Sequence, residues 1–566
     1  DAGWISGQAL NGFNVADLHH APIIFIMHRN GIQLSGACHG IMPKDPRPII
    51  RALGVEVLEI ESLHDPAELH ATMRRARELA RGGKPSLIYP TGCRSTKDRR
   101  VDLRYFGDRH GILREVETFA AKHEVPMDTE IWLTGSLMSF RDVVPMIECL
   151  FLVNGLPGGE AHHDGHMKGR DLATVLANPM LLDTESDMAA LASLRSAPPR
   201  RVVTKARPAP GSPNLVLSTT AIGFIELPAG GNTVSPRAGS EAAYAALAKE
   251  FPKQIFVASC DLDSSTKLAK THKFLPKGHR FECSIEEQVA AIMMNGVSVS
   301  SMKPQLNIFS TFAAFFEGIA REGFDMWRYQ RNLTGANEGL NVTYHLSHVG
   351  ACTGRDHFSG WSLDWINMAL CYLPYLHRFY APADARVAFN AVLDLAAHYG
   401  AHVIGIPRDN LPVLTKADRA TPLWNPGDAW EDVTPARVHA DSRAAIVAVG
   451  APSFLAIEAA DQSAADGKPA DVLIVNSLPL PGNFLSNLAK TYKTVVTIED
   501  GLIGTPEQGL RGLAGVVAGA LRENVRLSHI GISDPRIAPS DGHMEVWAHF
   551  GITKDAVVEA LRGGRV

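Results

Sequence analysis

The sequence predicts an α/β protein made of three successive doubly wound α/β domains. Apolar runs of strand length, such as APIIFIMH at 21–28, alternate with amphipathic helical stretches such as 65–83, the pattern of parallel βαβ units. This alternation restarts after 232 and again after 435. A length of 566 residues also suits three or four domains of ordinary size.

The first domain is expected over 1–205. Its strands are predicted at 21–28 and 85–92, and the helix at 65–83 between them ends at Gly-Gly after a basic last turn. Residues 104–160 read as an insertion, and 155–171 as a loop rich in glycine and histidine. The segment 196–214 is rich in proline and basic residues, so we expect a surface linker that continues to about 231.

The second and third domains are expected over 232–430 and 435–566. In the second, the patterns predict helices at 237–250, 284–296, 307–322 and 383–400, and strands at 253–261, 340–348 and 402–409. In the third, they predict strands at 444–450, 470–477 and 493–501, with helices near 455–464 and 506–523.

Composition argues against several classes of function. The formal net charge of −5 is small for this length, which disfavours a nucleic-acid binder or a basic membrane-surface protein. No apolar run reaches the ~18 residues of a membrane helix. The seven cysteines form no CxxC pair, so we expect free thiols in a reducing, cytoplasmic environment.

Oxygen ligands suited to a divalent cation occur near the start of the chain. Asp1 supplies a carboxylate, and Asn30 follows the first predicted strand with the backbone carbonyl of Ile32 close behind. Such hard ligands suit a cation that bridges a diphosphate, at a strand end where open α/β sheets bind ligands. An ordinary Asn-Gly turn is the alternative.

A glutamate and a set of phenylalanines could serve a heterocyclic ligand. Ser284 and Glu287 have the spacing of a capping box, but a buried Glu287 with a raised pKa could bond a heterocycle nitrogen. Phe309, Phe312 and Phe315 recur every three residues, which predicts one helix face. That face could belong to the core or stack on an aromatic ring.

Four scattered polar residues could together form a phosphate receptor. Two arginine forks, a hydroxyl and an imidazole suit a phosphate group, and each of these residues follows or begins a predicted element. They are Arg237, Ser265, His348 and Arg408. Separate surface or ion-pair roles are the alternative.

Taken in order, these motifs resemble the transketolase family of thiamine diphosphate enzymes, and the resemblance runs along nearly the whole chain. The family's Gly-Asp-Gly…Asn-x-Ile motif is similar to Asp1, Asn30 and Ile32, and its Ile-Arg-Glu-His-Ala helix to Ile285–Val289. Its Thr-Phe-x-x-Phe-x-x-Tyr segment resembles IFSTFAAFF at 308–316. Its Ser-Arg-Gln-Asn-Leu-Pro is similar to Pro407–Pro412.

The resemblance implies thiamine diphosphate and Mg²⁺ or Ca²⁺ as cofactors, with the cation on Asp1, Asn30 and the Ile32 carbonyl. Glu287 would activate the cofactor, Phe312 would stack on its aminopyrimidine ring, and Phe309 and Phe315 would line that pocket. The remaining implied positions are Asp261 at the subunit contact near the cofactor, Arg237, Ser265, His348 and Arg408 for the sugar phosphate, Asp356 for a substrate hydroxyl, and His163 for a diphosphate or substrate contact.

The chain also departs from the family pattern. Gly360 stands where the family has a second active-site histidine, which His357 could replace, and Ser6 stands where it has a glutamate. The family places about 150 residues before its Gly-Asp-Gly, so we expect these to be missing from this sequence or to form a separate N-terminal chain.

The resemblance implies transfer of a two-carbon ketol unit between sugar phosphates by a homodimer, with the active site at the subunit interface. Two alternatives stay open. One is another enzyme of the superfamily, similar to deoxyxylulose-phosphate synthase or to a 2-oxo-acid dehydrogenase E1 component. The other is a non-catalytic transketolase-like subunit.

Overall fold

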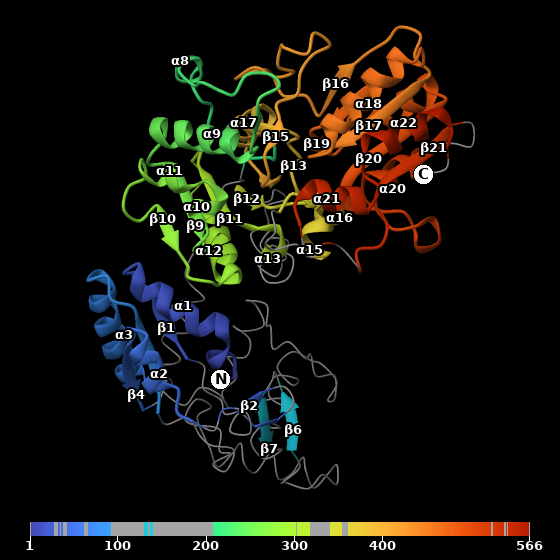
Figure 1. Cartoon of the computed structure of the whole chain (residues 1–566). Helices are drawn as coiled ribbons and strands as arrows, with labels where there is room; N and C mark the ends of the chain where they lie inside the picture. Colours follow the sequence, from blue (N-terminus) through green and yellow to red (C-terminus); the bar gives the residue numbers. More distant parts are fainter. Residues whose placement is uncertain are drawn as a thin grey trace, which may run out of the picture. The chain divides into compact units, whose positions relative to one another are not determined.

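The computed structural model forms two compact units, Asp1–Val203 and Thr204–Val566, which we describe separately (Figure 1). The residues that the structure describes are 2–27, 32–33, 36–37, 42, 44–61, 66–91, 130–133, 136–139, 208–301, 303–316, 340–353, 360–521, 525–536, 539 and 541–564. The α/β fold class expected from the sequence is confirmed, because parallel sheets flanked by helices dominate both units.

The first unit contains a parallel sheet with strand order β1-β5-β4. Its helices and strands are η1 (Ala2–Ile5), α1 (Gly7–Leu18), β1 (Ile24–Ile26), β2 (Ile32–Gln33), β3 (Gly36–Ala37), α2 (Arg47–Ala52), β4 (Glu56–Ile60), α3 (Pro66–Arg81), β5 (Ser86–Pro90), β6 (Glu130–Leu133) and β7 (Ser136–Ser139). Phe13, Ile50 and Leu87 join the helices to the sheet in one buried cluster. The expected strands and helix are present here, and β4 is an additional strand.

The expected insertion at 104–160 contributes the antiparallel pair β6–β7. The rest of that insertion, the loop at 155–171 and the first part of the linker at 196–214 lie outside the described residues.

The second unit begins with a seven-stranded sheet in the order β10-β9-β11-β12-β14-β13-β19. All its pairings are parallel except β13–β19. Its strands are β9 (Ile255–Ser259), β10 (Arg280–Glu282), β11 (Leu306–Phe312), β12 (Val342–Ser347), β13 (Arg378–Tyr380), β14 (Ala401–Ile406) and β19 (Ser477–Leu478). The central strands β11, β12 and β14 are buried at every position, as expected for a parallel sheet covered on both faces.

Helices pack on this sheet and connect its strands. α9 (Arg237–Glu250) and α17 (Ala385–Ala397) share a buried cluster with β9, β11 and β14, and α12 (Glu287–Val299) packs on β9, β11 and β12. A Cβ at Gly239 would lie 1.7 Å from the carbonyl oxygen of Ala385, so only glycine allows α9 and α17 to approach this closely. The other elements here are α8 (Thr219–Gly223), β8 (Thr233–Val234), α10 (Asp263–Thr266), α11 (Ala269–His272), α13 (Ala313–Phe315), α15 (Gly360–Leu363), α16 (Trp365–Tyr372), η5 (Leu373–Tyr375) and β15 (Leu411–Pro412).

The helix predicted at 307–322 is wrong over 307–312. Residues Leu306–Phe312 form the central strand β11, the helix α13 begins only at Ala313, and 317–322 lie outside the described residues. Phe309 and Phe312 therefore do not share a helix face with Phe315. The strand is buried at every position, and the periodicity of such a short run does not distinguish a buried helix from a buried strand.

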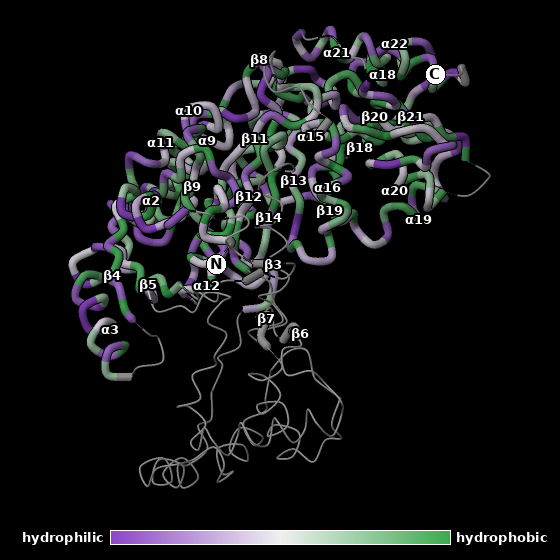
Figure 2. Tube along the Cα trace, turned by 90° about the horizontal axis from the view of Figure 1, so that it is seen from below, coloured by the Kyte–Doolittle hydropathy of each residue, from purple (hydrophilic) through white to green (hydrophobic). Residues whose placement is uncertain are grey.

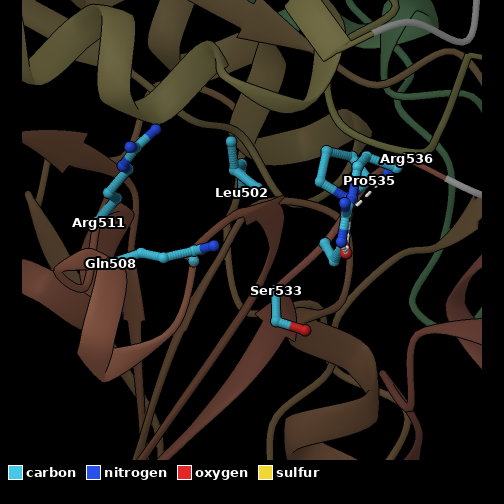
Figure 3. Close-up of a pocket in the computed structure, with 8 residues that line it drawn as sticks. Leu502, Gln508, Arg511, Ser533, Pro535 and Arg536 are labelled. Carbon is cyan, nitrogen blue, oxygen red and sulfur yellow. Dashed lines mark hydrogen bonds and ion pairs between the residues drawn. The ribbon is translucent and has the colours of Figure 1, made fainter.

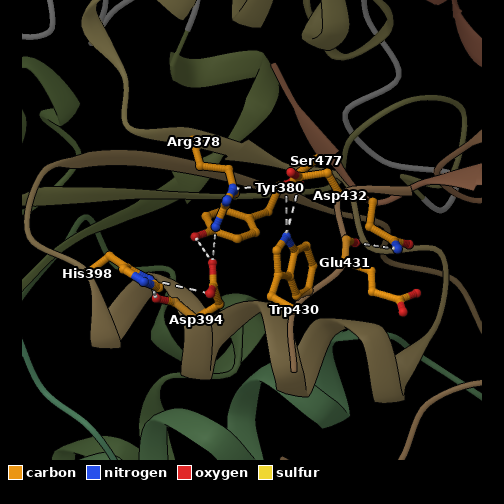
Figure 4. Close-up of polar contacts among 9 residues, drawn as sticks. Arg378, Tyr380, Asp394, His398, Trp430, Glu431, Asp432 and Ser477 are labelled. Atoms are coloured by element: carbon orange, nitrogen blue, oxygen red, sulfur yellow. Dashed lines mark hydrogen bonds and ion pairs between the residues drawn. The ribbon is translucent and has the colours of Figure 1, made fainter. Parts of the chain in front are cut away.

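A polar network connects the edge of the seven-stranded sheet to the rest of the second unit (Figure 4). Asp394 on α17 accepts hydrogen bonds from Arg378 at 2.5 Å and Tyr380 at 2.7 Å. On the other side, the indole of Trp430 donates to Ser477 of β19 at 3.0 Å. The short strand β19 therefore ties the later part of the chain to this sheet.

The last part of the second unit is a five-stranded sheet in the order β16-β18-β17-β20-β21. Its elements are β16 (Val433–Arg437), β17 (Ala444–Val449), α18 (Ser453–Ala465), β18 (Asp471–Val475), α19 (Phe484–Thr491), β20 (Thr494–Leu502), η6 (Pro506–Gln508), α20 (Gly512–Ala520), β21 (Arg526–Ile532), α21 (His543–His549) and α22 (Lys554–Arg562). Its inner strands are hydrophobic, whereas the surrounding helices alternate in hydropathy (Figure 2). Among the described residues, no helix is both long and apolar enough to cross a membrane.

Candidate active site

The predicted site residues of the second unit gather at the carboxyl edge of the seven-stranded sheet. Phe312 ends β11, His348 follows β12 directly, and Arg408 comes two residues after β14. Arg237 and Glu287 are the first residues of α9 and α12. Because these helices lead into parallel strands, their N-termini lie at the same edge, where open α/β sheets bind ligands.

Three residues at this edge adopt left-handed backbone conformations although none is glycine. They are Asp261 after β9, Ser284 after β10 and His348 after β12, with φ of 59°, 57° and 60°. Such conformations cost free energy and cluster at functional sites. Asp261 is exposed, and its backbone N–H donates to Glu282 Oε1 at 2.9 Å.

Glu287 is buried and incompletely hydrogen-bonded. Its side chain is 1% exposed, Thr311 Oγ1 donates to Oε1 at 3.3 Å, and Oε2 has no partner among the described residues. Burial raises the pKa of Glu287 above its usual range, although its own backbone N–H and the Thr311 hydroxyl partly offset this. Ser284 is not the helix cap, because α12 begins after Glu286 and has no side-chain cap.

The four residues predicted as a phosphate receptor are in contact through Arg237. Its Nη1 donates to the Ser265 carbonyl oxygen at 2.5 Å and lies 3.3 Å from His348 Nε2, while its Nη2 donates to the Arg408 carbonyl oxygen at 3.1 Å. Burial, with a smaller effect of the nearby Arg408 guanidinium, lowers the pKa of Arg237 to about 10. Two guanidinium groups held this close favour a bound anion.

An aromatic stack connects this cationic group to the phenylalanines. The rings of Phe312 and His348 stack with centroids 3.8 Å apart and planes 16° apart. Phe315 lies 5.6 Å from Phe312, centroid to centroid. Phe309 is fully buried and packs edge-on against Tyr344.

Most of the remaining predicted site residues lie outside the part of the chain that the structure describes. Asp1, Asn30, His163, Asp356 and His357 are outside the described residues. Ile32 lies in β2, whose backbone alone is described.

The structure also places the two positions that depart from the family pattern, Ser6 and Gly360, within helices or at their ends. Ser6 caps the N-terminus of α1, where its hydroxyl accepts a hydrogen bond from the Ala9 N–H. Gly360 begins α15.

Two polar residues of this edge were missed by sequence reasoning. Ser235 accepts from Arg237 Nε at 3.1 Å and donates to the Arg408 carbonyl oxygen at 2.6 Å, so it fixes both arginines. Thr311 supplies the hydrogen bond to Glu287. Neither residue carried a sequence signal, since Thr311 stands beside a second hydroxyl, that of Ser310, in β11.

A pocket lies beside the five-stranded sheet (Figure 3). It measures about 350 Å³ and lies beyond the carboxyl ends of β20 and β21. Its lining includes Gln508, Arg511, Ser533 and Arg536. Arg536 is paired with Asp534 at 2.5 Å. No sequence motif pointed to this pocket.

Comparison with known proteins finds a family match for the part of the second unit that contains most of the seven-stranded sheet. Residues 232–413 match the family described as transketolase, pyrimidine binding domain. The chain is also 27% identical over 294 residues to 1-deoxy-D-xylulose-5-phosphate synthase of Rhodococcus jostii (strain RHA1). That match covers 50% of this chain and 40% of the relative, so it spans less than half of the relative's length.

Solved structures show the same fold over a larger part of the chain. The transketolase of Campylobacter jejuni superposes with a TM-score of 0.63 at 15% identity, covering 99% of this chain and 75% of that one. A Pichia stipitis transketolase, in complex with xylulose 5-phosphate, reaches 0.64 at 15% identity with the same coverages. The Leishmania mexicana transketolase reaches 0.62 at 16% identity, covering 99% and 74%.

Proposed function

The chain is a divergent relative of the transketolase family of thiamine diphosphate-dependent enzymes, and from this premise we propose that it transfers a two-carbon ketol unit between sugar phosphates. The observation that carries the proposal is the Phe312–His348 stack. Aromatic rings that suit a heterocyclic cofactor there adjoin the Arg237 guanidinium, which lies 3.3 Å from His348 Nε2 and donates to the Arg408 carbonyl oxygen, and this supports the proposal.

The residues at this edge fit the pyrimidine end of thiamine diphosphate. Glu287 has a buried oxygen without a partner among the described residues and a raised pKa, so it can hold a proton at Oε2 and share it with a ring nitrogen. Phe312 and Phe315 offer aromatic surface beside it. When bound, the cofactor supplies the carbanion chemistry that breaks and forms a carbon–carbon bond next to a ketone.

The diphosphate and its Mg²⁺ or Ca²⁺ would be held by Asp1, Asn30 and the carbonyl of Ile32, as the resemblance implies. His163, His357 and Asp356 would contact cofactor or substrate.

The substrate phosphate would bind at Arg237, Ser265, His348 and Arg408. Arg237 already lies within hydrogen-bond reach of the other three residues. Its present acceptors there include two backbone carbonyl oxygens, and Asp409 and Glu241 compensate its charge only from a distance, so its N–H groups suit a phosphate dianion.

A homodimer would complete the site. Asp261 is exposed at this edge, and Ile285, two residues before Glu287, is 77% exposed. A large exposed apolar side chain beside a buried functional group supports a contact with a second chain at this edge.

The alternative is a synthase that condenses pyruvate with an aldose phosphate, favoured by the match to the Rhodococcus 1-deoxy-D-xylulose-5-phosphate synthase. One assay separates the two. With thiamine diphosphate and Mg²⁺ present, xylulose 5-phosphate and ribose 5-phosphate should yield sedoheptulose 7-phosphate. Product formed only from pyruvate and glyceraldehyde 3-phosphate would replace ketol transfer by the synthase reaction.

Arg408→Ala tests the phosphate role. We expect the KM for phosphorylated donors to rise at least tenfold, because a charge-assisted contact contributes about 1.5–3 kcal/mol, with little change for an unphosphorylated ketol donor. Arg419→Ala, an exposed arginine that pairs with Asp461, is the matched control. Equal effects on both classes of donor would show that Arg408 does not bind the phosphate.

A further inference from the structure

Three side chains with metal-binding atoms meet where the seven-stranded and five-stranded sheets adjoin. Cys352 follows β12, Asp409 follows β14, and His543 is the first residue of α21. One ligand atom from each lies within 4.8 Å of the other two. His543 Nδ1 is 2.9 Å from Asp409 Oδ2.

A fourth group, the carboxylate of Asp500 in β20, lies near the same cluster. Asp500 is 1% exposed, and its Oδ2 accepts from the Ala351 N–H at 3.2 Å. Its Oδ1 has no hydrogen-bond partner among the described residues. Asp500 interacts electrostatically with both Cys352 and His543, and its carboxylate also interacts with the Trp547 side chain, so a buried carboxylate lies beside this cluster.

The chemistry of the cluster suits a cation. A thiol, an imidazole and the carboxyl group of Asp409 lie together, and the carboxyl group of Asp500 interacts with two of them. Buried acidic groups are expected to be paired or to coordinate metals.

The cluster is also accessible to an ion. Asp409 and His543 line a cavity of about 420 Å³, together with Glu545 and Arg408. The Arg408 guanidinium, the nearest cation on that wall, is turned to the Thr353 carbonyl oxygen at 3.4 Å. The buried thiol, by contrast, is 0% exposed, which suits a ligand rather than a nucleophile that attacks a substrate.

We propose that Cys352, Asp409 and His543 bind a divalent transition-metal ion of the Zn²⁺ class, with Asp500 as a fourth ligand or as an acceptor that orients the others. Thiolate, imidazole and carboxylate together are a zinc ligand set, whereas Mg²⁺ and Ca²⁺ take oxygen ligands. Zinc bonds of about 2.0–2.3 Å put tetrahedral ligands roughly 3.3–3.8 Å apart, a small contraction of the present cluster. Binding forms the metal–sulfur bond and releases the thiol proton to solvent.

The metal proposal does not rest on the proposed ketol transfer, although Arg408 lines the same cavity, so its test uses metal alone. The full-length chain is freed of metal with a chelator and titrated with Co²⁺ and then Zn²⁺ without thiamine diphosphate. We expect one high-affinity ion per chain, a sulfur-to-cobalt charge-transfer band in the near ultraviolet, and release of a proton on binding.

Substitutions decide where the ion binds. Cys352→Ser should remove the charge-transfer band, and His543→Gln should weaken Co²⁺ binding at least tenfold. Cys283→Ser, at another buried cysteine, should keep both the band and the affinity. His543 is partly exposed, so its variant tests the site even where a change at the buried thiol prevents folding. The proposal is overturned if no stoichiometric binding occurs, or if both variants bind Co²⁺ as the wild type does.

Discussion

The Glu287→Gln substitution tests the most informative residue of the site, because it separates function from stability. Glutamine has the shape of glutamate and can still accept the hydrogen bond from Thr311, but it carries no acidic proton. If Glu287 activates the cofactor, turnover should fall by at least about 100-fold, the lower range for a positioned acid–base group. Cofactor binding should weaken far less.

The same substitution should lower turnover but raise the free energy of unfolding. Burial raises the pKa of Glu287 above its ordinary value of 4.5, so the folded chain keeps a proton that the unfolded chain has already lost. The contribution of Glu287 to the free energy of unfolding therefore falls as the pH rises above about 4.5 and is lowest once the folded carboxyl has ionised. Each unit by which the folded pKa exceeds the unfolded one costs about 1.4 kcal/mol once the carboxyl has ionised, and a neutral glutamine does not bear this cost. We expect Glu287→Gln to raise the free energy of unfolding by this order at pH 8 and to change it little at pH 4.

The assay is urea unfolding of the cofactor-free chain at both pH values, alongside the transfer assay. Glu458→Gln, an exposed glutamate on α18, is the matched control and should change neither stability nor turnover. Two results would refute the reasoning. Retained turnover would remove Glu287 from cofactor activation. A variant that is equally or less stable than the wild type at pH 8 would mean that the buried carboxylate carries no such penalty.

Two further predictions concern packing and pH. Gly239→Ala should lower the free energy of unfolding by about 2–3 kcal/mol, because its Cβ would lie 1.7 Å from the Ala385 carbonyl oxygen and overpacking costs typically 1–3 kcal/mol; a thermal unfolding curve matching the wild type would contradict this. His377 and His402 have pKa values lowered by burial, to about 4 for His377, so the unfolded chain binds more protons than the folded one below pH ~6.5 and stability should fall from there toward pH 4. His402→Gln should flatten this fall in melting temperature measured against pH, and parallel curves for variant and wild type would count against it.

Most of the regular elements could be predicted from local pattern. Long amphipathic helices such as 237–250 and continuous apolar strands such as 340–348 were found within a few residues of their observed ends, because periodicity and end signals are local properties. The helix predicted at 307–322 was wrong over 307–312, because this stretch is a central strand that is buried at every position. The capping-box alternative for Ser284 is wrong, because α12 begins after Glu286 and has no side-chain cap.

The candidate site could be predicted only as a set of residues. The resemblance selected Arg237, His348 and Arg408, and the structure brings them into contact. The hydroxyl of Ser235, which joins the two arginines, had no signal, because its role depends on residues 173 positions apart.

The sequence by itself determined the α/β class, the order of the strands and helices, and which side chains could take part in the chemistry. Only the tertiary structure decided that Glu287 has an unpartnered buried oxygen, and that Cys352, Asp409 and His543 lie together. The physical reason is that propensity and periodicity act over a few neighbouring residues, whereas burial and electrostatic coupling depend on elements that meet only after the parallel strands are ordered into sheets.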